Sequence, residues 1–267
     1  MGGAERSARK RKQQRGAVGR AAAASRGTSR TTIVAVAAVI VLAAGVIGGI
    51  VWMNASKSET QGQAIPVASE PGKLTYPGER QGAVVVRGSD DAKVTIDIYE
   101  DFICPICGQF EKRYGDQIEE KIASGELRVR YHMVPLLTKM SDPPGYSLDA
   151  ANATLCAADA GKFVPFHDSL FSAQPAEGGR GYSNSQLIDL GRSLGITGQK
   201  FASCVNSGKY NQELEAALNK AENNPDLLRT RNGRTFFGTP AVAVDGKLLN
   251  ALNNPNWLST LLAKHSK

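Results

Sequence analysis

The chain has 267 residues, a formal charge of +7 and only four cysteines, and 42% of its residues are apolar. This composition excludes a disulfide-stapled miniprotein and a chain that is disordered throughout. The charge is unevenly distributed, because residues 1–53 hold nine of the 32 Lys and Arg residues but only one acid. The remainder holds 23 basic and 24 acidic groups, so most of the protein is nearly neutral.

The N-terminal segment predicts a single membrane anchor. Residues 31–53 are uncharged, and the apolar run from Ile33 to Met53 would form about 31 Å of helix, enough to cross a hydrocarbon core of roughly 30 Å. Trp52 suits the membrane interface. The basic residues before the span predict that residues 1–30 stay in the cytoplasm and that the rest of the chain is extracytoplasmic.

A cleaved signal peptide is the alternative to an anchor. Signal peptides have apolar runs of about 7–15 residues that end at a small-residue cleavage site, and Trp52-Met53-Asn54 is a poor one. Lipidation is excluded because no cysteine lies near residue 53. Nucleic-acid binding by residues 1–30 is disfavoured because they lie directly before the span.

Residues 54–82, rich in Ser, Gln, Gly and Pro, predict a solvated linker, so the folded domain is expected at 83–267. Strands are predicted at 83–86, 93–99 and 127–134, and in the second of these Val94, Ile96 and Ile98 alternate with more polar residues. A helix between the last two would begin at Cys104-Pro105-Ile106-Cys107, and its apolar residues recur every fourth position: Phe110, Tyr114, Ile118 and Ile122. A helical crossover of this length predicts that the two strands it joins are parallel.

A helical insertion is predicted at about 140–230. Its helices are expected at 147–161, with Ser147 as a possible N-cap, and then at 163–171, 185–194, 198–207 and 210–223. Strands return at 241–244 and 247–250, and a closing helix begins near Pro255. The predicted strands and helices together indicate an α/β fold.

The motif Cys104-Pro105-Ile106-Cys107 predicts redox chemistry. This spacing places Cys104 at the helix N-cap and Cys107 one turn inside, while Pro105 takes the first helical position, where no N–H is needed. Unpaired N–H groups and the helix macrodipole then favour the Cys104 thiolate. Cys104 is therefore the expected attacked sulfur and Cys107 the buried resolving partner.

Other chemistries fit the sequence less well. A zinc site would need two more ligands near the CxxC, but Cys156 and Cys204 are isolated and the three histidines form no cluster, so we expect no metal. His132 and His167 are interpreted as structural, and His265 lies at the end of the chain. A Ser/His/Asp hydrolase is excluded because no G-x-S-x-G motif is present.

Two motifs together resemble a known family. Residues 100–107 end in the CxxC, and Gly238-Thr239-Pro240-Ala241 follows the helical block; the pair is similar to the DsbA-type thiol:disulfide oxidoreductases of the thioredoxin superfamily, especially the membrane-anchored forms of Gram-positive bacteria such as actinobacteria. The resemblance covers about residues 83–265 and implies a thioredoxin-like fold with an inserted helical subdomain. It also implies that Pro240 is cis, lies against the CxxC and, with Thr239, presents backbone groups to an extended substrate.

The sequence departs from the family pattern at two positions. Many members carry His where this chain has Ile106, and that imidazole helps to stabilise the thiolate. Members also often place a buried acid six residues before the first cysteine, as a proton relay, where this chain has Ile98. Asp97, expected on the opposite strand face, and Glu100, expected beyond the strand, are the candidate replacements; a solvated charge is the alternative for each.

The remaining cysteines, Cys156 and Cys204, are expected to form a structural disulfide, because an exported domain favours bridges and the family often has one in its helical subdomain. Free buried thiols and a second redox pair are the alternatives.

The resemblance implies an enzyme that introduces disulfides into exported proteins with reduced cysteines and needs no cofactor of its own. Its partner would be a quinone-linked membrane reoxidase of the DsbB or vitamin K epoxide reductase-like type. A thioredoxin-like reductase, an isomerase and a non-catalytic peptide-binding module with a structural CxxC remain the alternatives.

Overall fold

The computed structural model describes residues 60–68, 74–252 and 254–265, which belong to one compact unit. The predicted cytoplasmic tail and the span at 31–53 lie outside the described residues. Within the described part, no helix combines the length and the apolar character that crossing a membrane requires.

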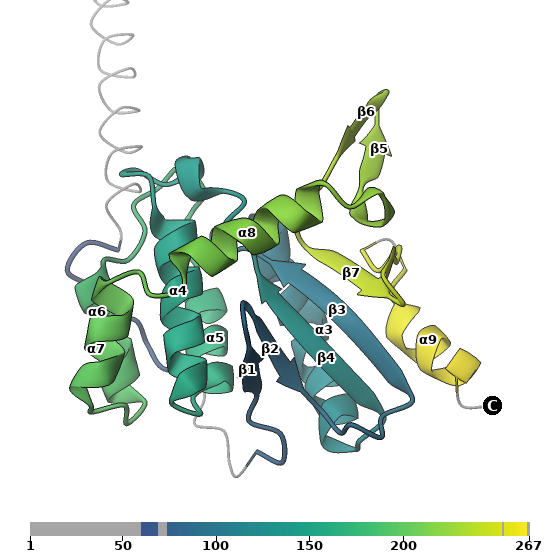
Figure 1. Ribbon diagram of the computed structural model, residues 1–267, viewed down its shortest axis with the longest axis horizontal. Helices are drawn as coiled ribbons and strands as arrows, with labels where there is room; N and C mark the ends of the chain where they lie inside the picture. Colours follow the sequence, from purple (N-terminus) through teal and green to yellow (C-terminus); the bar gives the residue numbers. More distant parts are fainter. Residues whose placement is uncertain (1–59, 69–73, 253, 266–267) are drawn as a thin grey trace, which may run out of the picture. The chain divides into compact units, whose positions relative to one another are not determined.

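A six-stranded sheet forms the centre of the domain (Figure 1). Its order is β1 (Glu79–Gln81), β2 (Val84–Arg87), β4 (Leu127–Met133), β3 (Val94–Glu100), β7 (Ala241–Val244) and β8 (Lys247–Leu248). The predicted parallel pair is confirmed, because β3 and β4 run parallel with Ile96 opposite Val129. All other neighbours in this sheet are antiparallel.

The two faces of β3 lie in different apolar clusters because side chains alternate along a strand. Ile96 and Ile98 share the main core with helix α3 (Pro105–Ala123), whose buried row is the predicted one: Phe110, Tyr114, Ile118 and Ile122. Trp257 of helix α9 (Trp257–His265) packs against the rings of Phe110 and Tyr114. On the opposite face, Tyr99 packs in a smaller cluster with Ala241 and Ala243.

The helical insertion lies beside the sheet (Figure 1). It comprises α4 (Tyr146–Asp159), α5 (Phe163–Ser172), α6 (Asn184–Ser193), α7 (Gln199–Asn206) and α8 (Asn211–Glu222), preceded by the 3-10 turn η1 (Thr138–Met140) and followed by η2 (Pro225–Leu227). Helix α6 begins with a reciprocal capping box between Ser183 and Gln186. The expectation that Ser147 caps α4 is wrong: the N-cap is Gly145, at a φ of 134° that favours glycine, and Ser147 lies within the helix.

Two parts of the fold differ from the sequence prediction. The folded domain begins before Ala83, because β1 pairs with β2, the Ile65 side chain is buried in the core, and the Thr60 hydroxyl donates to the Arg180 carbonyl at 2.7 Å. Much of the segment expected as linker is therefore structured. A small hairpin, β5 (Arg229–Arg231) and β6 (Arg234–Phe236), also has no counterpart in the prediction, because these three-residue strands alternate too briefly to be recognised.

Candidate active site

The CxxC motif opens helix α3 as predicted. Cys104 is the N-cap residue, with φ −73° and ψ 113°, and Pro105 follows at the start of the helix. The Cys107 N–H donates to the Cys104 carbonyl at 3.0 Å. Both cysteines are free thiols, Cys104 with 6% of its surface exposed and Cys107 with none. Only Cys104 is thus open to an approaching sulfur.

The two thiols have opposite electrostatic environments. Hydrogen bonding from Cys107 is the largest influence on Cys104 and, with contributions from Thr239 and the backbone N–H groups of Cys107 and Ile106, lowers the pKa of Cys104 to about 6 against the opposing effect of burial. Burial raises the pKa of Cys107 well above its ordinary value, and the charge on Cys104 adds to this effect. At neutral pH the structure therefore favours one thiolate, on the accessible sulfur.

The loop before β7 lies against the first cysteine. The Thr239-Pro240 peptide bond is cis, as the family resemblance implies. The Thr239 carbonyl accepts a hydrogen bond from the Cys104 thiol at 3.5 Å, although the two residues are 135 positions apart. Because β3 and β7 are adjacent strands, the sheet brings the two predicted motifs together.

Two polar side chains outside the motifs hold the CxxC loop. The Gln174 amide donates to the carbonyls of Phe102 and Cys104, at 3.1 and 2.9 Å. The buried Asp101 carboxylate accepts from the Ile103 N–H at 2.9 Å and from the Ser147 hydroxyl at 2.8 Å. Sequence reasoning did not identify either residue, because the contacts of Gln174, and that of Asp101 with Ser147, join segments far apart in the chain.

A cation on the hairpin also borders the site. The Arg229 guanidinium donates to the Pro240 carbonyl at 2.6 Å. Burial lowers the pKa of Arg229, and the negative charge that a thiolate brings to Cys107 or Cys104 acts in the opposite direction. Arg229 thus brings a positive charge to the loop whose Thr239 carbonyl contacts Cys104.

The two proton-relay candidates occupy opposite faces of the sheet. Asp97 is bound to Arg130 and His132, with Oδ–N distances of 2.6 and 2.7 Å, on the face away from α3. Glu100 is the last residue of β3, so the expectation that it lies beyond the strand is wrong. Its fully buried carboxylate contacts His167, with 3.1 Å between Oε2 and Nε2. Of the two, Glu100 is the one whose charge acts on Cys107.

Comparison with known proteins shows the family to which the chain belongs. A family model described as Thioredoxin matches residues 80–264, which is more than half of the chain. The chain belongs to the thioredoxin family. Its structure is similar to reduced DsbA from Mycobacterium tuberculosis, with 28% identity and a TM-score of 0.58 over 69% of this chain and 93% of that one.

Two further similarities extend the comparison. Reduced DsbG from M. tuberculosis, named a disulfide bond oxidoreductase, is 30% identical, with a TM-score of 0.55 over 73% of this chain and 89% of that one. The serine/threonine-protein kinase PknE of the same organism is 33% identical over 181 residues, which are 66% of this chain but 31% of the kinase. The chain thus spans about a third of the length of that curated relative. The segment similar to this chain therefore lies within a larger protein that is named as a kinase.

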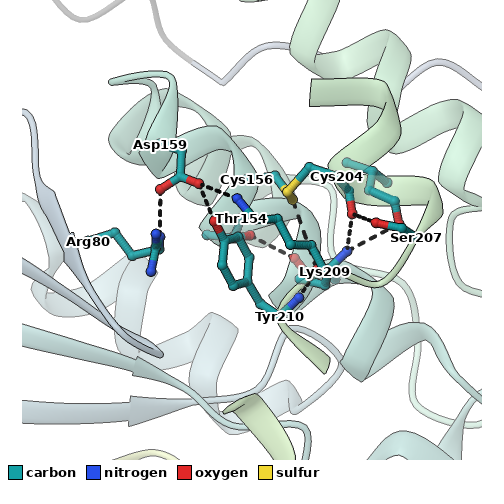
Figure 2. Close-up of a disulfide and its surroundings, with 11 residues drawn as sticks. Arg80, Thr154, Cys156, Asp159, Cys204, Ser207, Lys209 and Tyr210 are labelled. Carbon is teal, nitrogen blue, oxygen red and sulfur yellow. Dashed lines mark hydrogen bonds and ion pairs between the residues drawn. A yellow bond between two sulfur atoms is a disulfide. The ribbon is translucent and has the colours of Figure 1, made fainter. Parts of the chain in front are cut away.

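The remaining cysteines of this thioredoxin-family chain form the expected second bridge. Cys156 of α4 and Cys204 of α7 are joined by a disulfide, with their Cα atoms 6.0 Å apart (Figure 2). Beside it, the Asn152 side chain donates to the Val205 carbonyl at 3.2 Å and accepts from the Tyr210 N–H at 2.9 Å. The bridge therefore lies within a network that joins α4 to the segment between α7 and α8.

The low pKa of Cys104 predicts a pH-dependent stability of the reduced protein. Between about pH 6 and pH 8.5 the folded state holds a Cys104 thiolate, while an unfolded thiol with a pKa of about 8.5 stays protonated. The unfolded state then binds one more proton, so the free energy of unfolding should rise by about 1.4 kcal/mol per pH unit in this window, and the gain is lost as pH falls through 6. Urea unfolding of the reduced chain, compared with that of Cys104→Ser at each pH, measures this contribution of Cys104 to the free energy of unfolding. Equal slopes for the two proteins would contradict it.

Removing the charge of Arg229 should weaken the Cys104 thiolate. We expect Arg229→Gln to raise the pKa of Cys104 by about 0.5–1 unit, since a nearby cation favours the charged form and solvent at this half-buried position screens part of the effect. Arg229→Lys keeps a positive charge, so its Cys104 pKa should stay closer to that of the unmodified chain. The ultraviolet absorbance of the thiolate, titrated with pH, is the measurement, with the exposed Arg234→Gln on the same hairpin as the control. An unchanged titration midpoint in Arg229→Gln would show that Arg229 does not influence the pKa of Cys104.

Proposed function

We propose that this chain is a membrane-anchored, extracytoplasmic thiol:disulfide oxidoreductase that introduces disulfide bonds into exported proteins through Cys104 and Cys107. The observation that carries the proposal is the asymmetry of the two thiols, since the accessible Cys104 has a pKa lowered to about 6 and the buried Cys107 has a pKa raised well above its ordinary value. Similarity to the DsbA and DsbG structures supports it.

The reaction follows from this asymmetry. In the oxidised enzyme a substrate thiolate attacks the Cys104 sulfur, a mixed disulfide forms, and the Cys104–Cys107 bond breaks to leave a thiolate on Cys107, which takes a proton. A second substrate thiolate then attacks the substrate sulfur and releases the Cys104 thiolate, the better leaving group. The substrate loses two electrons and the enzyme gains them as a dithiol.

The surface beside Cys104 suits an extended, unfolded polypeptide. Ile106 has 49% of its surface exposed within the motif, and Phe236 has 43% exposed on the hairpin. The Phe236 ring lies 3.3 Å from the position that a Cβ atom on Gly238 would take, directly before Thr239-Pro240. Two exposed apolar side chains thus border the segment that we propose binds the substrate backbone, in a form of strand addition.

The direction of electron flow is set by the reduction potential. Equilibration of the purified chain with glutathione measures it, and an oxidase should have a potential less negative than that of thioredoxin, about −270 mV. A value at or below that figure would assign a reductase instead, a result that Ile106 in place of the family's imidazole would favour. As an oxidase the enzyme also needs an electron acceptor, for which we propose a quinone-linked membrane reoxidase.

The proposal that the chain is anchored and exported rests on the uncharged run at 31–53 and the basic residues before it. A fusion of alkaline phosphatase after residue 82 tests the orientation, because that enzyme is active only outside the cytoplasm. We expect an active fusion that stays with the membrane after a carbonate wash. An inactive fusion would place the domain in the cytoplasm, and a released one would indicate cleavage.

The non-catalytic alternative makes a different prediction. If Cys104–Cys107 were a fixed brace, mild reduction would leave it closed. We expect instead that Cys104 is alkylated at low reductant concentration, while Cys156–Cys204 stays closed. Mass spectrometry of the alkylated peptides distinguishes the two cases, and opening of the second bridge first would argue against a redox site.

A further inference from the structure

Three side chains that could bind a metal ion converge below the CxxC. Glu100 ends β3, Glu111 lies in the second turn of α3, and His167 lies in α5. One potential ligand atom of each lies within 4.8 Å of the others, and Glu100 and His167 are 0% and 3% exposed. Sequence reasoning considered only cysteines and histidines as ligands, so it did not predict this cluster.

The carboxylates of the cluster have unused acceptor capacity. Among the described residues, no hydrogen-bond donor reaches Glu100 Oε1 or Glu111 Oε1, and both atoms are buried. Burial, reinforced by the negative charge of Glu100, raises the pKa of Glu111 well above its ordinary value. Two adjacent buried carboxyl groups need either a proton or a cation between them.

His167 is already oriented as a metal ligand would be. Its Nε2 atom faces Glu100, while Nδ1 lies 3.1 Å from the carboxylate of Asp168. Against the lowering effect of burial, the carboxylates of Asp168 and Glu100 raise the pKa of His167 to about 10. A metal ion would therefore displace the proton on Nε2, while the carboxylate on Nδ1 would fix the tautomer of the metal-bound imidazole.

The cluster can also be reached from outside. Glu111, His167 and Asp168 line a cavity of about 780 Å³ that is bordered by residues of both α3 and α5. Arg87, which lines the same cavity, is paired with Glu119. A small cation and a water ligand could therefore enter beside Glu111.

We propose that Glu100, Glu111 and His167 Nε2 form a binding site for a divalent transition-metal ion of the Zn²⁺ class, with water from the cavity as the fourth ligand. Two carboxylate oxygens and one imidazole nitrogen suit Zn²⁺ better than Ca²⁺ or Mg²⁺, which take six or more oxygen ligands. Ligands of tetrahedral Zn²⁺ are about 3.3 Å apart, so the three atoms need approach by at most about 1.5 Å. The ion would link β3 and α3 of the thioredoxin core to α5 of the insertion.

Metal titration of the full chain tests the site. The chain is purified in detergent without a histidine tag and oxidised, so that Cys104 and Cys107 cannot act as ligands. Zn²⁺, in competition with a chromophoric chelator, should bind with a stoichiometry of one, and Co²⁺ should give the absorption of a four-coordinate complex. A hundredfold excess of Zn²⁺ over the Kd should raise the Tm by about 5–10 °C.

Matched variants assign the ligands. We expect Glu111→Gln and His167→Gln to weaken Zn²⁺ binding by more than about 100-fold, and Asp168→Asn to weaken it by about 10–100-fold through the imidazole. Asp116→Asn is the control, because Asp116 is exposed on α3 and lines the same cavity. Its affinity should equal that of the unmodified chain.

Two results would overturn the proposal. One is the absence of Zn²⁺ binding to the oxidised chain at millimolar concentration, as a proton shared by the two carboxyls predicts. The other is binding that Glu111→Gln and His167→Gln leave unchanged. If these variants fail to fold, X-ray absorption of the Zn²⁺-loaded unmodified chain decides, since one imidazole with oxygen ligands supports the site and any other set rejects it. Neither outcome depends on the redox function.

Discussion

Replacing Cys107 by serine is expected to trap substrate proteins on Cys104, whereas replacing Cys104 by serine should abolish thiol–disulfide exchange. The reason is that the two sulfurs have different roles in the exchange reaction. Cys104 is the accessible thiol with a pKa of about 6, so it forms and leaves mixed disulfides, while the buried Cys107 can attack a mixed disulfide on Cys104 and release the substrate in its reduced form. Without Cys107, the Cys104 thiolate can still attack a disulfide of a substrate protein, from which one substrate thiolate leaves, and the resulting mixed disulfide has no internal thiol to release it.

The measurement has two arms. In vitro, oxidative refolding of a reduced secreted protein should fall to the uncatalysed rate with either variant. In cells, non-reducing electrophoresis of Cys107→Ser should show high-molecular-weight adducts that disappear with reductant. The double variant Cys104→Ser/Cys107→Ser is the matched control, and adducts no more abundant than in that control would contradict the enzyme assignment.

Loss of the Cys156–Cys204 bridge is expected to destabilise the domain by about 4 kcal/mol without altering the chemistry of Cys104. The bridge spans 48 residues, and closing a loop of that length removes this much entropy from the unfolded chain in the chain-entropy model. The network at the bridge should keep the folded geometry in place, because the Asn152 side chain continues to donate to the carbonyls of Cys204 and Val205.

The background for this experiment is Cys104→Ala/Cys107→Ala, in which Cys156–Cys204 is the single bridge. Urea unfolding with and without reductant then compares the same chain with the loop closed and open, and Cys156→Ala/Cys204→Ala in that background checks the result. A separate titration of Cys156→Ala/Cys204→Ala alone should give an unchanged pKa for Cys104. A difference in unfolding free energy below about 1 kcal/mol would show that the bridge has another role.

Much of the fold was predictable because its determinants are local. The alternation in β3, the four-residue spacing in α3 and the position of Pro105 depend on neighbours within a few residues, and each prediction agrees with the structure. Motif resemblance added the cis bond before Pro240 and the second disulfide. The short strand β1 and the β5–β6 hairpin escaped prediction because strands of three residues carry too little periodicity.

The sequence by itself determined the order of the elements, the redox pair at a helix N-terminus and the identity of its partner loop. Only the tertiary structure decided which charges face that pair. Arg229 reaches the site through the Pro240 carbonyl, and Glu100, rather than Asp97, points to the α3 side of β3. The physical reason is that electrostatic and coordination geometry depend on distances between segments far apart in the chain, and packing of the sheet against α3 and α5 sets those distances.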